Sequence, residues 1–405
     1  MGAPDARCGQ QFRQIGLAIE AMTRTAVYLD HNASSPLLPE TRAALLAALD
    51  LTGNPSSVHG HGRVLRNLVE TGRDQVAGLA GADRQQVIFT ASATEAITQA
   101  IVGSVKALGI DRIVISAGEH AAAGKAAEMA GVPLTLIGMD RAGIMCVDEL
   151  AARLAEAGAI GERLLVAVHW VNNETGVVQP LGAVEALVGP TPHYLFVDAV
   201  QAFGKLPLEF QSRATDMMAV SAHKIGGPAG VGALLMKGHA DQVRLIAGGG
   251  QEAGRRGGTE AAALIAGFGA AAAAFADKFH AADTSGLIES AETGLRRLAP
   301  DLVVFGEAAH RIGNVSNLAV PGLKNAVAMM GLDLRGISIS SGSACSSGKV
   351  GPSHVLKAMG VSAELSECAM RLSVGWNSTQ ADIEVFLDGF SEVLERHRQR
   401  RGKAA

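Results

Sequence analysis

Residues 217–228 read MMAVSAHKIGGP, an apolar run that ends in Ser221, His223 and Lys224 before a Gly-Gly-Pro turn. An apolar run without alternation is typical of a parallel strand that helices cover on both faces. In open α/β sheets, ligands collect at the carboxyl ends of such strands. The stretch therefore indicates an α/β fold with Lys224 at a ligand site, where partial desolvation makes an amine nucleophilic. A surface lysine would show the same local pattern.

Similar apolar runs surround this strand and alternate with helical patterns. Strands are predicted at residues 87–90, 112–116, 134–138, 164–171, 194–200, 217–221 and 230–236. Helical patterns, such as those at 95–108 and 121–130, lie between them. This alternation predicts an α/β fold with a mainly parallel seven-stranded sheet in a large domain.

The pattern changes after an alanine-rich helix near residues 261–281. Helices are predicted at residues 285–298, 326–332, 354–359 and 380–397, and strands at residues 302–306, 315–320, 337–341 and 371–374. These shorter elements indicate a smaller α+β domain. We predict an N-terminal extension (1–25), a segment joining the small domain (26–39), a large domain (40–274) and a small C-terminal domain (275–405).

Two other predicted strands also end in polar side chains. Asp198 follows one apolar run, three residues before Gln201, and can pair with a ring N–H or cap the next helix. Thr94 lies where a strand passes through small hydroxyl residues into a helix, whose N-terminus suits an anion or simple capping. Together with Lys224, these positions offer a phosphate cradle, an anchor for a protonated ring nitrogen and a Schiff-base lysine. That combination is typical of a pyridoxal 5′-phosphate (PLP) site.

Composition narrows the class of protein. The chain has 405 residues, and its 48% hydrophobic and 18% charged fractions exclude global disorder. A net charge of −4 and only 4% aromatic residues argue against nucleic acid as a partner. The longest uncharged apolar stretch, residues 261–276, is shorter than the ~18–20 residues of a membrane span. Four scattered cysteines and the lack of a secretory pattern predict reduced thiols, a cytoplasmic protein and no membrane partner.

The order of the motifs resembles that of cysteine desulfurases of the NifS/IscS type, which are class V aminotransferase-like enzymes. The resemblance extends from Tyr28 to about Leu387. The segments that carry it are 28–33 (YLDHNA), 53–59 (GNPSSVH), 89–90 with 93–95, 119–120, 171–176 (VNNETG), 197–201 (VDAVQ), 221–228 (SAHKIGGP), 248–252 (GGGQE), 256–259 (RGGT), 340–348 (SSGSACSSG) and 352–356 (PSHVL). The resemblance implies a PLP-dependent transferase of aminotransferase fold type I.

The same resemblance implies how the cofactor is bound. Lys224 would bind PLP covalently, and Asp198 would keep the pyridine nitrogen protonated so that the ring accepts electrons. His120 would stack on the ring and transfer protons. The remaining contacts implied for the ring hydroxyl are Gln201 and Asn173, and those for the phosphate are Thr94, Ser221, His223 and the neighbouring subunit's Thr259. A contact from a neighbouring subunit implies a homodimer.

The resemblance also implies the substrate chemistry. Arg371 would bind the substrate carboxylate, since a planar guanidinium pairs bidentately with a carboxylate, and Asn173 would face the substrate. Cys345 would be the nucleophile that takes sulfur from L-cysteine, leaving L-alanine and an enzyme persulfide in the C-terminal domain. The sulfur would then pass to an acceptor protein, for example a scaffold for iron–sulfur cluster assembly. Cys8, Cys146 and Cys368 lack this context and are predicted to be inert.

The same motifs are compatible with other functions. Within the PLP class, a selenocysteine lyase or a lyase without a persulfide remains open, and a non-catalytic homologue that only binds a sulfur acceptor is a third alternative. Cys345, His354 and Cys368 match no zinc spacing, so no metal site is predicted. The identity of the acceptor, activity on selenocysteine and the presence of residues 1–21 in the native protein are left open by the sequence.

Overall fold

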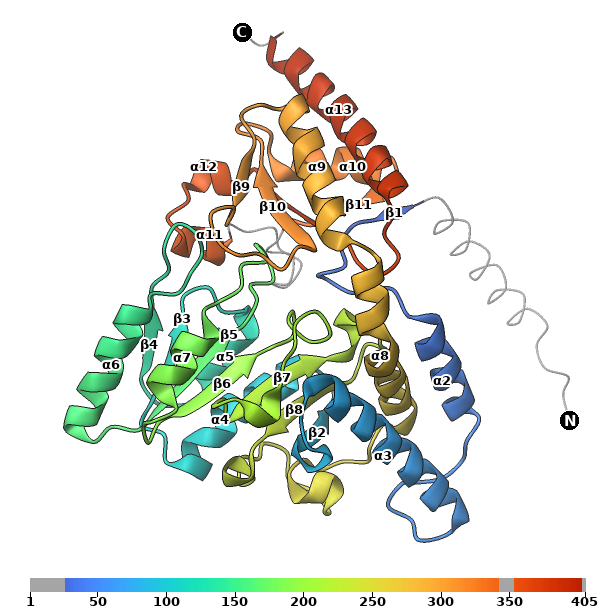
Figure 1. The fold of residues 1–405 in the computed structure, drawn as a ribbon, viewed down its shortest axis with the longest axis vertical. Coiled ribbons are helices and arrows are strands. Elements are labelled where there is room, and N and C mark those ends of the chain that lie inside the picture. Colours follow the sequence, from blue (N-terminus) through green and yellow to red (C-terminus); the bar gives the residue numbers. More distant parts are fainter. Residues whose placement is uncertain (1–25, 342–352, 403–405) are drawn as a thin grey trace, which may run out of the picture.

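A seven-stranded sheet organises the larger part of the molecule (Figure 1). The computed structural model describes residues 26–341 and 353–402. The strand order is β2-β8-β7-β6-β5-β3-β4. The strands are β2 (Val87–Thr90), β3 (Arg112–Ser116), β4 (Leu134–Ile137), β5 (Leu164–His169), β6 (Tyr194–Asp198), β7 (Met217–Ser221) and β8 (Gly232–Met236). All seven predicted strands are present, and only β8 runs antiparallel to its neighbours β2 and β7.

Helices cover both faces of this sheet, which explains the uninterrupted apolar runs. Neighbouring residues of one strand serve opposite cores: Val114 packs in one cluster, whereas Ile113 and Ile115 pack in the other. One face is covered by α4 (Ala93–Leu108) and α5 (Ala121–Met129). The other face is covered by α3 (Gly60–Ala80), α6 (Val147–Ile160), α7 (Leu181–Val188) and α8 (Ala262–Ala281). The sheet is therefore buried on both sides.

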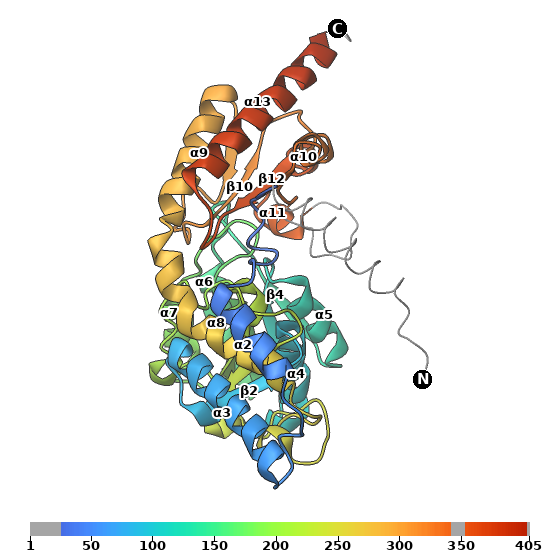
Figure 2. The same cartoon turned by 90° about the vertical axis from the view of Figure 1, so that its right-hand side faces the viewer.

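The alanine-rich helix α8 packs against α3 and against α2 (Pro39–Leu49) (Figure 2). Among the described residues it is the one helix whose length and composition would let it cross a membrane. Phe268 and Phe275 of this helix lie in the core of the large sheet. Burial against protein therefore accounts for its apolar character.

The smaller part contains two short sheets. A three-stranded antiparallel sheet has the order β12-β10-β9, and a two-stranded parallel sheet joins β1 to β11. Its strands are β1 (Val27–Tyr28), β9 (Val303–Phe305), β10 (Val315–Ala319), β11 (Ile337–Ser338) and β12 (Ala369–Ser373). Its helices are α9 (Thr284–Leu298), α10 (Asn325–Asp333), α11 (His354–Ala358), α12 (Ala363–Ser366) and α13 (Gln380–Gly402). The four predicted helices are present, and α12 was not predicted.

The first described strand belongs to this smaller part, because β1 pairs with β11 and Leu29 lies in the same apolar cluster as α9 and α13. The predicted division at residues 274 and 275 falls inside α8. Phe275 and Phe279, on the C-terminal side of that division, pack in the core of the large sheet. The four domain limits stay predictions.

Candidate functional site

A cavity of about 320 Å³ lies at the carboxyl ends of β5, β6 and β7. This is the edge of an open α/β sheet where ligands bind. Seven candidate residues from the sequence line it: Thr94, His120, Asn173, Asp198, Gln201, His223 and Lys224. The structure thus brings together side chains that are separated by up to 130 positions in the chain. Four further candidates lie elsewhere or outside the described residues, as given below.

Lys224 is the last residue of a short 3-10 turn that follows β7 directly. Its Nζ donates hydrogen bonds to the carbonyl oxygens of Asn32, at 2.6 Å, and Ala33, at 2.8 Å. The next residue but one, Gly226, has a φ of 72°, and a Cβ there would lie 2.7 Å from the Leu38 side chain. Glycine is required because the N-terminal segment packs against this turn. The close approach of the N-terminal segment also places the carbonyl oxygens of Asn32 and Ala33 within hydrogen-bond distance of Lys224.

Asp198 ends β6 and is only 7% exposed. One carboxylate oxygen, Oδ1, accepts a hydrogen bond from the Val200 backbone N–H at 3.0 Å. The predicted strand continued to Val200, but the observed strand ends at Asp198 because the chain turns there. Because the chain turns here, Asp198 lines the cavity.

His169 is a functional candidate that the sequence analysis missed. It ends β5, lines the cavity and lies opposite Asp198 in the strand register. Its Nδ1 is 2.7 Å from Oε1 of Glu119, and both side chains are buried. Burial lowers the pKa of His169, but the Glu119 carboxylate and the charge of Asp198 outweigh it, so the pKa is raised. The sequence did hold a signal for this residue, because His169 is a polar residue at the end of an apolar run.

One side of the cavity is formed by the start of α4 and the turn before Lys224, which hold the residues that the resemblance assigns to the phosphate. Ser92 caps this helix by accepting a hydrogen bond from the Glu95 N–H, and Thr94 lies in the first turn. Unpaired backbone N–H groups there favour an anion. Burial, together with the charge of Lys224, lowers the pKa of His223 to about 4, so this imidazole is neutral at neutral pH. Ser221 is buried at the end of β7 and is not among the lining residues.

His120 caps the N-terminus of α5. Its Nδ1 accepts a hydrogen bond from the Ala122 backbone N–H at 3.2 Å, so in the neutral ring the proton is assigned to Nε2. The adjacent Glu119 carbonyl lies 2.7 Å from Nε2 of His354, at the start of α11. The capping bond fixes the imidazole at the cavity wall, as the stacking role implied by the sequence requires.

Arg371 is fully buried in β12 and lies outside the lining set of the cavity. Its Nη2 donates to Asp30 Oδ1 at 2.7 Å, and its Nη1 donates to the Asn173 carbonyl at 3.1 Å. Its Nε is buried and has no hydrogen-bond partner among the described residues. A buried unpaired donor of a guanidinium costs free energy, and an incoming carboxylate would satisfy it. This geometry fits the anion-binding role that the resemblance implied.

The last two candidates are placed differently. Thr259 lines a separate hollow of about 90 Å³ together with Arg256 and Gly230. Cys345 lies outside the described residues, within the interval 342–352. The described residues on either side have defined contacts: Ser340 bridges to Arg371, and Ser353 Oγ donates to Glu174 Oε2 at 2.5 Å.

The cavity residues fit PLP. The buried amine of Lys224 suits its aldehyde, and the buried carboxylate of Asp198 suits its ring nitrogen. The neutral imidazole of His223 and the N-terminus of α4 suit its phosphate. The fit also has an energetic basis, because a cationic ring N–H would stabilise the carboxylate of Asp198, which is only 7% exposed at the cavity wall. PLP is the cofactor that these residues can hold.

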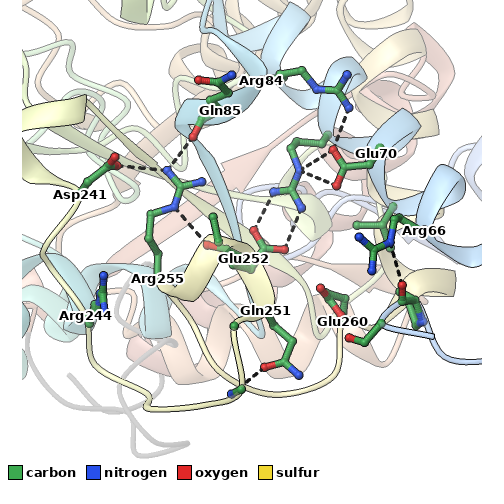
Figure 3. Close-up of a pocket in the computed structure, with 17 residues that line it drawn as sticks. Arg66, Glu70, Arg84, Gln85, Asp241, Arg244, Gln251, Glu252, Arg255 and Glu260 are labelled. Carbon is green, nitrogen blue, oxygen red and sulfur yellow. Dashed lines mark hydrogen bonds and ion pairs between the residues drawn. The ribbon is translucent and has the colours of Figure 1, made fainter. Parts of the chain in front are cut away.

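A larger hollow, of about 800 Å³, lies apart from this site (Figure 3). Several of its charged side chains pair with each other: Arg73 binds both carboxylate oxygens of Glu252, at 2.6 and 2.9 Å, and Arg255 pairs with Asp241. Glu252 also accepts a hydrogen bond from the Phe89 backbone N–H. These pairs satisfy one another, and the lining lacks the lysine, aspartate and histidines of the smaller cavity. Size alone therefore does not mark the catalytic site.

Comparisons with known proteins agree with this geometry. Residues 27–386 match the aminotransferase class-V family model. A cysteine desulfurase from Trichormus azollae is 36% identical over 381 residues, covering 92% of this chain and 94% of the relative. The X-ray structure of a NifS-like protein from Rickettsia africae has a TM-score of 0.82 at 30% identity, covering 91% of this chain and 99% of that one. The structure of SspA in complex with cysteine has a TM-score of 0.75 at 27% identity, covering 87% and 99%.

Proposed function

The chain belongs to the aminotransferase class-V family of PLP-dependent enzymes, and we propose that it is a cysteine desulfurase that delivers sulfur from L-cysteine to Cys345 and then to an acceptor. The observation that supports this most strongly is the convergence of Lys224, Asp198 and His120 on one cavity. PLP supplies an electron-withdrawing ring that stabilises negative charge beside the substrate nitrogen. The fold and the cofactor are as the sequence predicted.

The residues of this chain then have distinct tasks. Lys224 holds the cofactor covalently, Asp198 keeps the ring nitrogen protonated, and His120 moves a proton at its Nε2. Thr94, the neutral His223 and Ser221 hold the phosphate. Because Lys224 is only 9% exposed, water is largely excluded from the reacting amine.

Substrate binding is assigned to Arg371 and Asn173. The Nε of Arg371 donates to the carboxylate of L-cysteine, while Asp30 and the Asn173 carbonyl keep the guanidinium in place. The thiolate of Cys345 attacks the substrate sulfur, so that a sulfur–sulfur bond forms as the carbon–sulfur bond breaks. The electron pair stays on the substrate Cβ, which takes a proton and gives L-alanine.

The proposed reaction is tested by incubating the PLP-loaded protein with L-cysteine and a thiol. We expect L-alanine and sulfide to be released in equal amounts. Pyruvate and ammonia in place of alanine would contradict desulfuration, because they report elimination. A parallel assay with selenocysteine distinguishes a cysteine desulfurase from a selenocysteine lyase. Turnover of selenocysteine without turnover of cysteine would identify a selenocysteine lyase.

We also propose a homodimer in which the partner subunit completes the site. The hollow that Thr259 lines shares Glu252 and Glu260 with the larger hollow of Figure 3. Three apolar side chains are exposed within two residues of the lining residues Ser56, Arg66 and Arg244: Val58, Val64 and Leu245. Such exposure favours a protein–protein interface. Light scattering of the purified protein is expected to give twice the chain mass, and a monomer at micromolar concentration would contradict the proposal.

Two further expectations remain proposals. The sulfur acceptor is a partner protein, for example an iron–sulfur scaffold, because a persulfide carried on a cysteine must be passed to another thiol. A cytoplasmic location follows from the predicted reduced state of the cysteines. Cys146 and Cys368 are both free thiols in the described part of the chain. Transfer of isotope-labelled sulfur from cysteine to candidate acceptor proteins, detected by mass spectrometry, would test the proposed acceptor. Cell fractionation would test the proposed location.

A further inference from the structure

Lys205 is a buried ammonium to which the proposed mechanism assigns no task. It is 8% exposed and lies in the turn that follows β6. Its Nζ donates to Oε1 of Gln201 at 2.9 Å and lies 5.9 Å from the centre of the Phe279 ring. Within residues 26–341 and 353–402, it forms no ion pair with a carboxylate. A buried charge without a counter-charge is costly, and such groups concentrate at functional sites.

The charged groups that face Lys205 are cationic. Burial, and then the charges of Lys224 and Arg371, lower the pKa of Lys205 to about 7. Burial together with Lys205 lowers the pKa of His31 to about 3, so this neighbouring ring is neutral. The environment opposes a positive charge at this position. A contribution to the stability of the fold therefore does not explain why a lysine is found here.

The hydrogen bond of Lys205 fixes how the Gln201 amide is oriented. The Nζ of Lys205 donates to Oε1 of Gln201, which places the amide oxygen toward Lys205. The amide nitrogen, Nε2, then donates to the Asn32 carbonyl at 3.0 Å, and Lys224 donates to the same oxygen. An amide nitrogen carries two hydrogens, and Gln201 lines the cofactor cavity. The second N–H is therefore available to the cavity.

We propose that Lys205 is a positioning residue: it holds the Gln201 amide so that an N–H, and not the carbonyl oxygen, meets the ring oxygen of PLP. This inference rests on the proposed function. An N–H stabilises negative charge on that oxygen, and this charge is greatest when the Lys224–cofactor link is deprotonated. Loss of Lys205 removes one of the two hydrogen bonds that hold this orientation and leaves only the bond to the Asn32 carbonyl, so the amide presents its N–H to the ring oxygen less often, which disfavours the deprotonated form.

The test is a pH titration of the visible absorbance of the PLP-loaded protein. Lys205→Met is expected to raise the midpoint of this titration by about one pH unit. Met is similar in length and removes an uncompensated buried charge, so the melting temperature is not expected to fall. A purely structural role would instead lower the melting temperature and leave the midpoint unchanged.

Lys237 provides the matched control. Its Nζ likewise donates to an uncharged oxygen, in this case the backbone carbonyl of Arg213, and lies 5.8 Å from the centre of the Phe210 ring. It follows β8 at the end where Met236 pairs with Met217, which is opposite to the site. Lys237→Met is expected to leave the midpoint unchanged, because its charge and bond are remote from the cofactor.

A double substitution separates positioning from direct charge. In a Gln201→Leu background, Lys205→Met is expected to shift the midpoint by less than half of its shift in the native background. An equal shift in both backgrounds, or no shift in a PLP-loaded Lys205→Met protein, overturns the proposal. Failure of Lys205→Met to fold also contradicts it, because Lys205 would then be a structural anchor. A native protein with no visible band after PLP addition would reject the proposed function instead.

Discussion

Replacing Lys224 with alanine is expected to lower L-alanine formation from L-cysteine by at least about a thousand-fold. The amine is the nucleophile that holds the cofactor covalently, and in the structure it lies at the end of β7 with two backbone carbonyls as partners. No other lysine lines the cavity in the described part of the chain. The variant should also fail to retain PLP after borohydride treatment, which mass spectrometry of the intact chain measures.

The control for this experiment is Lys237→Ala, which changes a lysine at the opposite end of β8. That variant is expected to keep both the borohydride-fixed cofactor and the native rate. If Lys224→Ala retained more than about a tenth of the native rate, a covalent role for this lysine would be untenable.

Replacing Cys345 with alanine has the second large effect. We expect the variant to bind PLP and to change its visible spectrum with L-cysteine, because Lys224, Asp198 and Arg371 are intact. Release of L-alanine should fall by at least about a hundred-fold, since the acceptor for the substrate sulfur is missing. Amino-acid analysis of the reaction mixture measures this directly.

Cys146→Ala is the matched cysteine variant. Cys146 is half-buried just before α6 and is not among the residues that line the cavity. This variant should release alanine at the native rate. Alanine release by Cys345→Ala at the native rate would reject Cys345 as the nucleophile, while loss in both variants would indicate a general effect of thiol removal.

The strands of the large sheet were predicted well because their signal is local. Continuous apolar runs specify strands that are covered on both faces, and five-residue segments such as Arg112–Ser116 have the predicted limits. The predicted strand ends were wrong next to the site. The strand predicted at residues 164–171 ends at His169, because the next residues turn toward the cavity. The helix α12 has four residues and carries too little periodicity to be recognised.

The candidate site was predicted from motifs, and its supporting contacts were not. Seven motif residues line one cavity, as expected of residues that follow neighbouring strands. Sequence gives no sign that the carbonyl of Asn32 binds Lys224, because a backbone oxygen is present in every residue. The ion pair of Asp30 and Arg371 joins positions 341 residues apart. The Lys205–Gln201 hydrogen bond orients the amide toward the Asn32 carbonyl, a contact that the sequence does not indicate. Such contacts are set by tertiary packing.

The most direct test of the account is mass spectrometry of the peptide that contains Cys345, taken from PLP-loaded protein after brief exposure to L-cysteine and alkylation. The account predicts that this peptide gains the mass of one sulfur atom, that a thiol reductant removes it, and that Lys224→Ala protein shows no gain. Formation of L-alanine with no added sulfur on Cys345, or with the sulfur on Cys146 or Cys368 instead, would contradict it.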